Sequence, residues 1–245
     1  MTARLDLRAY GDAGLLAGVV RRGYESRWRT TQVLAAAVRS AHPSWLVDLV
    51  ATYDHLFVSF DPGVGDHAGV GALLEQLSDA LDETSAGLDT EARTFRVPVL
   101  FGGETGPDLD DVAAELSLTA EALVAALAAG PWRVRFVASP VGTPFTDRSD
   151  WSVSVPRMTV PRVAVPPGSV ALSGSQSIIY PVPSPGGWRL VGRTPLRVVD
   201  LADESGTLVP YRAGDRLEYV PIDADRFAEL ERLGERLGEW LGAEP

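Results

Sequence analysis

The stretch "PRVAVPPGSVALSGSQSIIYPVPSPGGWRLVGRTP", residues 161–195, sets the character of the second half of the chain. Short apolar runs such as Val163–Val165, Ser169–Leu172 and Trp188–Val191 are separated by prolines and glycines. Apolar runs that recur about every ten residues between turn residues are typical of all-β domains. The stretch therefore predicts a compact β-barrel or sandwich.

The flanking sequence extends this prediction in both directions. Trp132, Val134 and Phe136 alternate with arginines, and Leu196–Val199 and Leu217–Val220 are further apolar runs. These segments are expected to be strands of the same domain.

Three helices are expected around these strands. Asp108 and Thr119 are placed to cap two short helices that precede the strands. Residues 226–241 read as an amphipathic helix, which either packs on the barrel or on a partner.

The first ninety residues alternate between strand-like and helix-like patterns. This order, β-α-β-β-α-β, predicts a ferredoxin-like unit. The expected strands are residues 15–20, 45–51, 56–60 and 95–99, and the expected helices are residues 27–41 and 70–81. The polar, turn-rich residues 82–93 suit a domain boundary. We therefore expect an α+β protein, with a ferredoxin-like α/β domain at 1–90 followed by a β-barrel domain with a C-terminal helix at 91–245.

Composition excludes several kinds of chemistry. The 245 residues contain no cysteine, and all 22 basic residues are arginine. Disulfides, thiolate metal sites, a P-loop lysine and a Schiff-base lysine are therefore absent. A net charge of −11 argues against binding to nucleic acid or to an anionic membrane surface.

The location of the protein and any metal site follow from similar arguments. No apolar stretch is long enough for a transmembrane helix, and the N-terminal "MTARLDLRAYGD" lacks the apolar run of a signal peptide, so we expect a cytoplasmic protein. His42, His55 and His67 have no metal-ligand spacing, and we predict no metal site.

"FGGETGPDLDD", residues 101–111, places a glycine-rich turn before an expected helix. Such a turn can present backbone N–H groups to an anion. Four carboxylates in the same stretch would repel phosphate, so a tight turn with a helix cap is the alternative interpretation.

Candidate binding residues concentrate in residues 156–195. Arginine side chains there suit bidentate recognition of a carboxylate or phosphate, Gln176 suits an amide or urea group, and Tyr180 with Trp188 would form an apolar wall with a polar edge. Gly186 and Gly187 would allow close backbone approach. The predicted substrate-binding residues are Arg157, Arg162, Gln176, Tyr180, Gly186, Gly187, Trp188, Arg193 and Thr194. A rigid barrel corner with solvated arginines explains the same spacing equally well. No catalytic residue is assigned.

Several of these motifs resemble the signature of the allophanate hydrolase subunit 1 family. Besides residues 161–195, with their SPGGW and GRTP motifs, the matching blocks are "YGDAGLL" (10–16), "DLVATYDHLFVSFDP" (48–62) and "VPVLFGGETGPDLDDVA" (97–113). The resemblance extends over nearly the whole chain. It implies an α/β domain followed by a cyclophilin-like barrel, related to the carboxyltransferase domain of urea carboxylase.

The resemblance also implies a function. The family includes the B subunit of the ATP-dependent 5-oxoprolinase, a hydrolase that opens a small cyclic amide carboxylate. Members work with a second carboxyltransferase-like subunit, which is of the allophanate hydrolase subunit 2 type or corresponds to the C subunit of 5-oxoprolinase. The implied cofactor is ATP, and the resemblance leaves open whether this chain or a partner binds it.

One departure from the family pattern keeps two other roles open. Ala126 stands where family members carry a histidine, and residues 137–151 keep Pro140, Gly142, Pro144 and Phe145 but not the usual Gly-Phe-x-Pro-Gly-Phe-Pro-Tyr motif. The family also contains a regulatory protein that inhibits a histidine kinase by contact. The chain is therefore expected to be an enzyme subunit, such a regulator, or a structural half of a hetero-oligomer.

Overall fold

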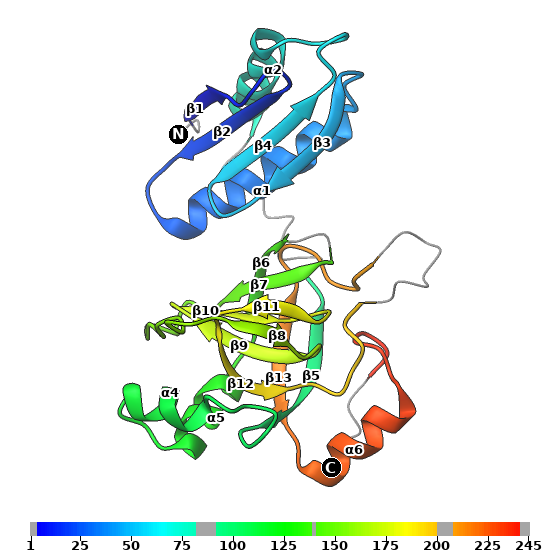
Figure 1. Cartoon of the computed structure of the whole chain (residues 1–245). Helices are drawn as coiled ribbons and strands as arrows, with labels where there is room; N and C mark the ends of the chain where they lie inside the picture. Colours follow the sequence, from blue (N-terminus) through cyan, green and yellow to red (C-terminus); the bar gives the residue numbers. More distant parts are fainter. Residues whose placement is uncertain (1–3, 82–91, 139–140, 200–207, 241–245) are drawn as a thin grey trace. The chain divides into compact units, whose positions relative to one another are not determined.

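The computed structural model describes residues 4–81, 92–138, 141–199 and 208–240. The chain divides into two compact units, residues 1–91 and residues 92–245 (Figure 1). Each unit has its own hydrophobic core. None of the helices in the described ranges has the length and apolar character needed to span a bilayer.

The first unit is a four-stranded antiparallel sheet in the order β1-β2-β4-β3. Helices α1 and α2 pack against one face of this sheet (Figure 1). The elements are β1 (Arg4–Ala9), β2 (Gly14–Val20), α1 (Tyr24–Ala41), β3 (Leu46–Ala51), β4 (His55–Phe60) and α2 (His67–Ala80). The ferredoxin-like class is confirmed.

Local sequence explains why these elements form. Leu56, Val58 and Phe60 are buried while the residues between them are not, which is the period of two of a half-buried strand. At the start of α2, the Asp66 carboxylate accepts a hydrogen bond from the Gly69 backbone N–H at 2.7 Å. Such a cap satisfies a donor that the helix itself leaves unpaired.

The second unit is built around a closed barrel. Among the described residues, its strands follow the order β10-β7-β6-β13-β5-β12-β9. The barrel strands are β5 (Thr94–Phe101), β6 (Trp132–Ala138), β7 (Thr143–Asp147), β9 (Ser169–Ser173), β10 (Gln176–Ile179), β12 (Arg189–Arg193) and β13 (Arg216–Pro221). Three helices accompany it in the described ranges, α4 (Leu109–Glu115), α5 (Ala120–Ala128) and α6 (Ala224–Leu233).

The barrel interior contains a polar chain among its apolar side chains. The Tyr219 hydroxyl lies 2.7 Å from Ser177 Oγ, and the Thr146 hydroxyl donates to the Ser177 carbonyl at 2.8 Å. Burial raises the pKa of Tyr219, and its hydrogen bonds to Ser177 and Thr146 oppose that shift. Satisfied polar groups of this kind specify one packing arrangement, because an unpaired alternative would be costly.

A two-stranded ribbon covers part of the outer barrel surface. It consists of β8 (Arg162–Val165) and β11 (Ser184–Gly186). Ala171, Ile178 and Leu190 belong to a separate buried cluster that also contains Tyr180 and Trp188. Their neighbours in sequence, Val170, Leu172, Ile179 and Val191, belong to the main barrel core. Successive residues of these strands therefore belong alternately to the main core and to the outer cluster, so both faces of each strand are buried. This explains why the sequence here is a nearly continuous run of apolar residues.

Three details differ from the sequence prediction. The strand expected at 95–99 is β5 of the barrel, so it does not complete the first sheet. In that sheet β1, which the pattern of apolar residues did not reveal, pairs with β2 instead. Residues 196–199 form only an isolated bridge, Arg197 to Arg236.

The C-terminal helix is also shorter than expected. It ends at Leu233 because Gly234 adopts a left-handed conformation (φ 65°), in which its N–H caps the Leu230 carbonyl. Leu237 then packs into the barrel core, and Leu241 lies outside the described residues.

Candidate functional site

An Arg–Asp clamp fixes residues 156–195, hereafter the signature segment, to the start of α4. Arg162 donates from both terminal nitrogens to the two Asp108 carboxylate oxygens, at 2.9 and 2.8 Å. The same carboxylate accepts the Leu190 backbone N–H at 2.7 Å. Asp108 is therefore the residue before α4, as predicted, but its side chain does not cap that helix. Its three hydrogen bonds tie together three segments that are far apart in sequence.

Tyr180 and Trp188 are packed into the outer cluster beneath the ribbon. Both side chains are buried, and Trp188 meets Phe145 edge to face with ring centroids 5.7 Å apart. Burial raises the pKa of Tyr180, while a hydrogen bond from the Trp188 backbone and the charge of Arg157 oppose the shift. The exposed Arg157 guanidinium lies 5.6 Å from the centroid of the Trp188 ring. Within this cluster, Arg157 is the polar group that faces solvent.

The two glycines of the SPGGW motif differ in how closely they are approached. A Cβ at Gly186 would lie 2.1 Å from the Tyr180 hydroxyl, whereas one at Gly187 would meet Pro161 at an ordinary 3.6 Å. Gly186 is thus required for close approach to Tyr180, a contact within the protein. Gly187 has room for a small side chain.

Arg193 and Thr194 lie at the opposite end of β12 from Arg189. Arg193 pairs with Glu231 of α6 and stacks over Phe227 at 5.2 Å. Thr194 is buried, and its backbone N–H donates to the Gly168 carbonyl at 2.9 Å. The structure therefore brings Arg157, Arg162, Tyr180, Gly186, Gly187 and Trp188 together and leaves Arg193 and Thr194 apart from them.

Gln176 begins β10 and is paired with Ser173 across a tight hairpin. Ser173 Oγ accepts a hydrogen bond from Arg157 Nε at 3.3 Å. Gln176 is half-buried and belongs to the same end of the barrel as Arg157.

The glycine-rich turn at 101–111 is packed against β12. The Gly102 N–H donates to the Val191 carbonyl at 3.0 Å, and the Gly106 N–H donates to the Gly102 carbonyl at 2.9 Å. A Cβ at Gly106 would lie 2.1 Å from the Val191 oxygen. These N–H groups are used within the fold, which favours the interpretation of a tight structural turn over that of an anion cradle.

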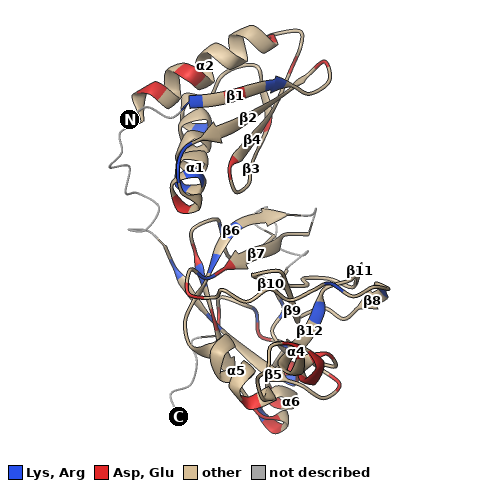
Figure 2. Cartoon of the chain, turned by 90° about the vertical axis from the view of Figure 1, so that its left-hand side faces the viewer, with Lys and Arg blue, Asp and Glu red and all other residues tan. Residues whose placement is uncertain are grey.

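The carboxylates that follow this turn pair with a neighbouring arginine. Glu115 of α4 lies 3.1 Å from Arg189 of β12, and Asp111 lies 3.9 Å from it. Figure 2 shows this acidic helix beside the basic strand.

The region that departs from the family pattern is well packed where it is described. Arg148 donates to the Ala126 carbonyl at 2.8 Å and pairs with Asp150 at 2.9 Å. Its guanidinium lies over Trp132 and Trp151. Arg148 thus caps the C-terminal end of α5 at Ala126.

Comparison with known proteins identifies the fold and the family. The sequence profile of the carboxyltransferase domain, subdomain C and D, matches residues 5–209. The chain belongs to this family. It is 29% identical over 232 residues to the B subunit of 5-oxoprolinase from Bacillus subtilis, covering 91% of this chain and 95% of that protein.

Solved structures extend the comparison. The crystal structure of the protein TTHA0988 is 30% identical, with a TM-score of 0.73 over 87% of this chain, which spans only 40% of that longer chain. The urea amidolyase of K. lactis has a TM-score of 0.78 over 96% of this chain and 16% of its own, at 15% identity, which shows a shared fold. The chain is therefore a carboxyltransferase domain subunit similar to the B subunit of 5-oxoprolinase.

The histidines of this carboxyltransferase subunit lie in the first unit. His55 Nδ1 is 2.7 Å from Asp54 Oδ1, and His67 Nε2 is 3.1 Å from the Gly11 carbonyl. In the described ranges, no group of three or more His, Asp or Glu side chains is arranged to hold a metal ion.

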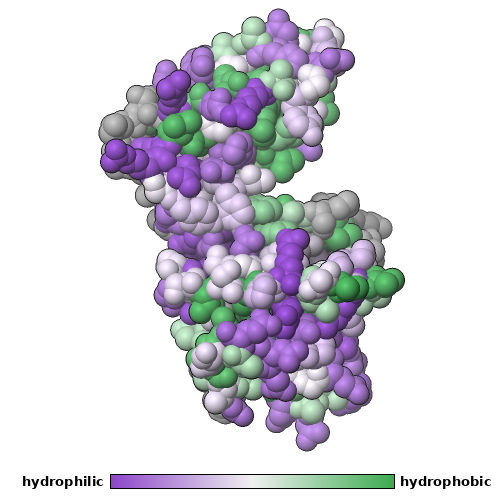
Figure 3. All heavy atoms as spheres, turned by 60° about the vertical axis from the view of Figure 1, so that its left-hand side comes forward, coloured by the Kyte–Doolittle hydropathy of each residue, from purple (hydrophilic) through white to green (hydrophobic). Residues whose placement is uncertain are grey.

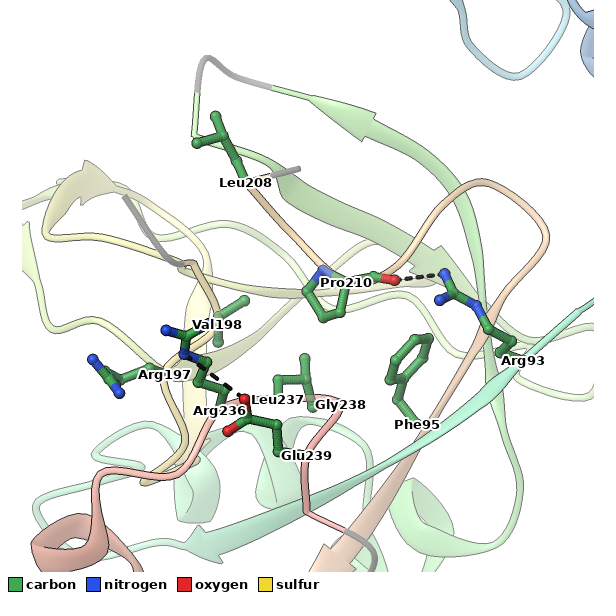
Figure 4. Close-up of a pocket in the computed structure, with 10 residues that line it drawn as sticks. All are labelled: Arg93, Phe95, Arg197, Val198, Leu208, Pro210, Arg236, Leu237, Gly238 and Glu239. Atoms are coloured by element: carbon green, nitrogen blue, oxygen red, sulfur yellow. Dashed lines mark hydrogen bonds and ion pairs between the residues drawn. The ribbon is translucent and has the colours of Figure 1, made fainter. Parts of the chain in front are cut away.

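Sequence reasoning missed a pocket at the C-terminal end of this carboxyltransferase subunit. The pocket has a volume of about 240 Å³ and includes Arg93, Arg197 and Arg236 among its lining residues. It combines residues from the start of β5, the segment after β12 and the segment after α6 (Figure 4). The three arginines are 39 or more positions apart, so no local motif announces the pocket.

Proposed function

We propose that the chain is the B-type subunit of an ATP-dependent 5-oxoprolinase complex, which opens 5-oxoproline to glutamate together with a second carboxyltransferase-type subunit. The observation that carries this proposal is the similarity to the B subunit of the B. subtilis 5-oxoprolinase, which spans both units of the chain. In TTHA0988 the similar segment is joined to further sequence, which fits a fold that operates with additional domains.

The proposed reaction explains why ATP is needed. An amide carbonyl is a poor electrophile, and transfer of the terminal phosphoryl group of ATP to its oxygen makes the carbon reactive. One water adds to that carbon, and the ring C–N bond breaks with protonation of the nitrogen, which leaves an acyl phosphate. A second water hydrolyses the acyl phosphate, which gives the carboxylate of glutamate and releases phosphate. Arginine side chains and backbone N–H groups stabilise negative charge on oxygen in such steps.

The described residues suit binding better than proton transfer. Arg157 is exposed above Trp188, and the half-buried Gln176 lies at the same end of the barrel. We propose these two as direct contacts for a carboxylate or amide. Arg162, Tyr180, Gly186 and Trp188 would act by holding this surface in place, since their polar groups are engaged within the protein.

The partner would supply the general base and would cover an apolar surface. Near β8, Val160 and Val163 are exposed by 75% and 91%. On the face drawn in Figure 3, hydrophobic patches lie among hydrophilic side chains. Exposed apolar patches rimmed by polar residues are common at protein interfaces. The ribbon is therefore the surface on which we place the second subunit.

A regulatory role is the second candidate. It is favoured by Ala126 and by the altered segment 137–151, where Arg148 holds the end of α5. In that case the chain would bind a histidine kinase and have no turnover with a carboxyltransferase partner.

The test is reconstitution. The chain would be purified from its native cell with its bound partners, and ATP-dependent conversion of 5-oxoproline to glutamate would be measured with and without ATP. Turnover that depends on ATP and on this chain supports the proposal. An intact complex without turnover rejects it, and a histidine kinase in the complex supports the regulatory role. Val163→Asp is expected to release the second subunit, with Leu233→Asp, an exposed position on α6, as a matched control.

A further inference from the structure

The pocket at the C-terminal end of the second unit contains Arg197, which has no carboxylate partner in the part of the chain that the structure describes. Arg197 Nε donates to the Gly234 carbonyl at 3.0 Å. Among the described residues, no carboxylate lies within ion-pairing distance of its guanidinium. By contrast, Arg93 in the same pocket is held by the buried Asp215 carboxylate at 2.8 Å.

The backbone fixes the position of Arg197. Its N–H donates to the Glu235 carbonyl and its carbonyl accepts the Leu237 N–H, both at 2.9 Å. This bridge joins the segment after β12 to the segment after α6. A side chain that is anchored at its base and at Nε presents its terminal nitrogens with little loss of conformational freedom on binding.

Arg236 adds a second guanidinium, which forms an exposed ion pair with Glu239. Its Nε lies 4.0 Å from a Glu239 carboxylate oxygen (Figure 4). The two side chains are exposed by 39% and 63%. Exposed pairs of this kind contribute little free energy, on the order of 0–1 kcal/mol. The carboxylate of Glu239 is therefore an exposed negative charge in the pocket lining that holds Arg236 only weakly.

The rest of the lining is apolar. Phe95, Val198, Leu208, Pro210 and Leu237 line the pocket together with the charged residues. An inorganic phosphate would leave this apolar surface uncovered, whereas a carboxylic acid with a small apolar body would cover it. The volume of about 240 Å³ lies below the range of about 300–1,000 Å³ that drug-sized ligands occupy, which favours a small ligand over a nucleotide.

We propose that this pocket binds a small carboxylic acid, with Arg197 on the carboxylate and the apolar lining on its body. If the proposed function holds, the ligand is 5-oxoproline or the glutamate formed from it. The pocket includes residues 236–239, beyond the part of the chain that the family profile matches. It is separate from the Arg157 surface on which the proposed function rests.

The experiment is direct titration of the purified full chain, without partner or ATP. The probes are 5-oxo-L-proline, L-glutamate, the neutral lactam 2-pyrrolidinone and inorganic phosphate, followed by calorimetry and by the fluorescence of Trp240, which is the neighbour of Glu239 in sequence. Saturable binding is expected for at least one of the two carboxylates and not for 2-pyrrolidinone. Arg197→Gln is expected to weaken binding about 10- to 100-fold, as the loss of a charged hydrogen bond does.

Two variants keep the test independent of folding. Glu239→Gln removes a negative charge from the pocket lining at an exposed position and is expected to tighten carboxylate binding a few-fold, because the two negative charges no longer repel each other. Arg226→Gln removes the same charge from α6, away from the pocket, and is expected to leave binding unchanged.

The results separate the pocket from the proposed function. The inference is wrong if neither carboxylate binds, if phosphate or 2-pyrrolidinone binds as tightly, or if Arg197→Gln and Glu239→Gln leave carboxylate binding unchanged. Turnover by the complex with no binding here would reject the pocket and keep the function. Binding to the pocket with no turnover by the complex would keep the pocket and reject the proposed function.

Discussion

Arginines of the signature segment and arginines of the C-terminal pocket have the same chemistry but different partners. Arg162, Arg189 and Arg193 each face a carboxylate of their own chain. Arg197 has a backbone carbonyl instead, and Arg236 has an exposed carboxylate at 4.0 Å. A guanidinium that holds a buried carboxylate, as Arg162 holds Asp108, contributes to the fold. Arg197, which has no carboxylate partner among the described residues, is the arginine that we expect a ligand to bind. Predicted binding residues therefore cannot be ranked by residue type alone.

The largest expected effect concerns Gly106, which packs the glycine-rich turn against the Val191 carbonyl of the signature segment. Gly106→Ala would place a Cβ 2.1 Å from the Val191 carbonyl, where only backbone could move. We expect a loss of more than about 3 kcal/mol of unfolding free energy, by urea denaturation, because overpacking against backbone cannot relax. Gly187→Ala, with 3.6 Å to Pro161, is the matched control and should change stability little. Equal losses in both variants would show that the signature region is not the closed structure described above.

The next prediction compares Asp108, the carboxylate that holds the signature segment, with Glu239, the carboxylate at the pocket. Asp108→Asn leaves Arg162 without its buried counter-charge, and we expect a loss of about 2–3 kcal/mol in unfolding free energy. Glu239→Gln, in the exposed pair at the pocket, should cost less than about 0.5 kcal/mol. The comparison fails if the two urea midpoints shift by the same amount.

Alkaline pH should weaken the barrel through its buried tyrosines. Burial raises the pKa values of Tyr211 and Tyr219. A group whose pKa is raised on folding contributes stability that is present below its unfolded pKa, about 10, and is lost as pH rises above it. Each tyrosine should lower the unfolding free energy by about 1.4 kcal/mol per pH unit above that value.

Urea titrations between pH 9 and about 11 would measure this slope. Tyr211→Phe and Tyr219→Phe should each flatten it, whereas the exposed Tyr10→Phe should leave it unchanged. Tyr180, whose pKa burial also raises, contributes a further part of the slope, so an unchanged slope in the double variant is the result that would place the alkaline sensitivity elsewhere.

The smallest effect concerns Arg157, the signature arginine that resembles those of the pocket. It has no carboxylate within ion-pairing distance among the described residues and lies over Trp188. Arg157→Gln should therefore cost only about 0.5–1 kcal/mol, the contribution of an exposed cation–π contact, with a change in tryptophan fluorescence. A loss as large as that of Asp108→Asn would move Arg157 into the structural group.

The sequence predicted elements better than it predicted which sheet each element joins. Alternation identified β4, β5 and β6, because a half-buried strand imposes a period of two on its own residues. It could not show that β5 pairs with β13, since that register, Thr94 with Arg216, depends on a segment more than a hundred residues away. Residues 196–199 look like a strand because Leu196 and Val198 are buried, yet among the described residues they pair only through one bridge.

The candidate site shows the same limit, because local sequence does not reveal partners that are distant along the chain. The apolar and glycine positions left open whether Trp188 and Gly186 line a pocket or a rigid barrel corner, and the structure shows Trp188 buried and Gly186 tight against Tyr180. Arg162 was read as free for a ligand because its partner, Asp108, lies 54 positions away and reads locally as a helix cap. The pocket at Arg197 was invisible for the same reason, since three distant segments build it.

The parallel pairing of β13 with β5 has a consequence for synthesis of the protein. The barrel joins a strand that begins at Thr94 to one that ends at Pro221, so its seam cannot form until that last strand has left the ribosome. Contacts between such distant segments slow folding, because the intervening chain must be ordered first. The first unit, which depends on none of these strands, is free to fold earlier. During translation the edges of the barrel strands therefore stay unpaired, and this is the interval in which a chaperone would do most to prevent aggregation.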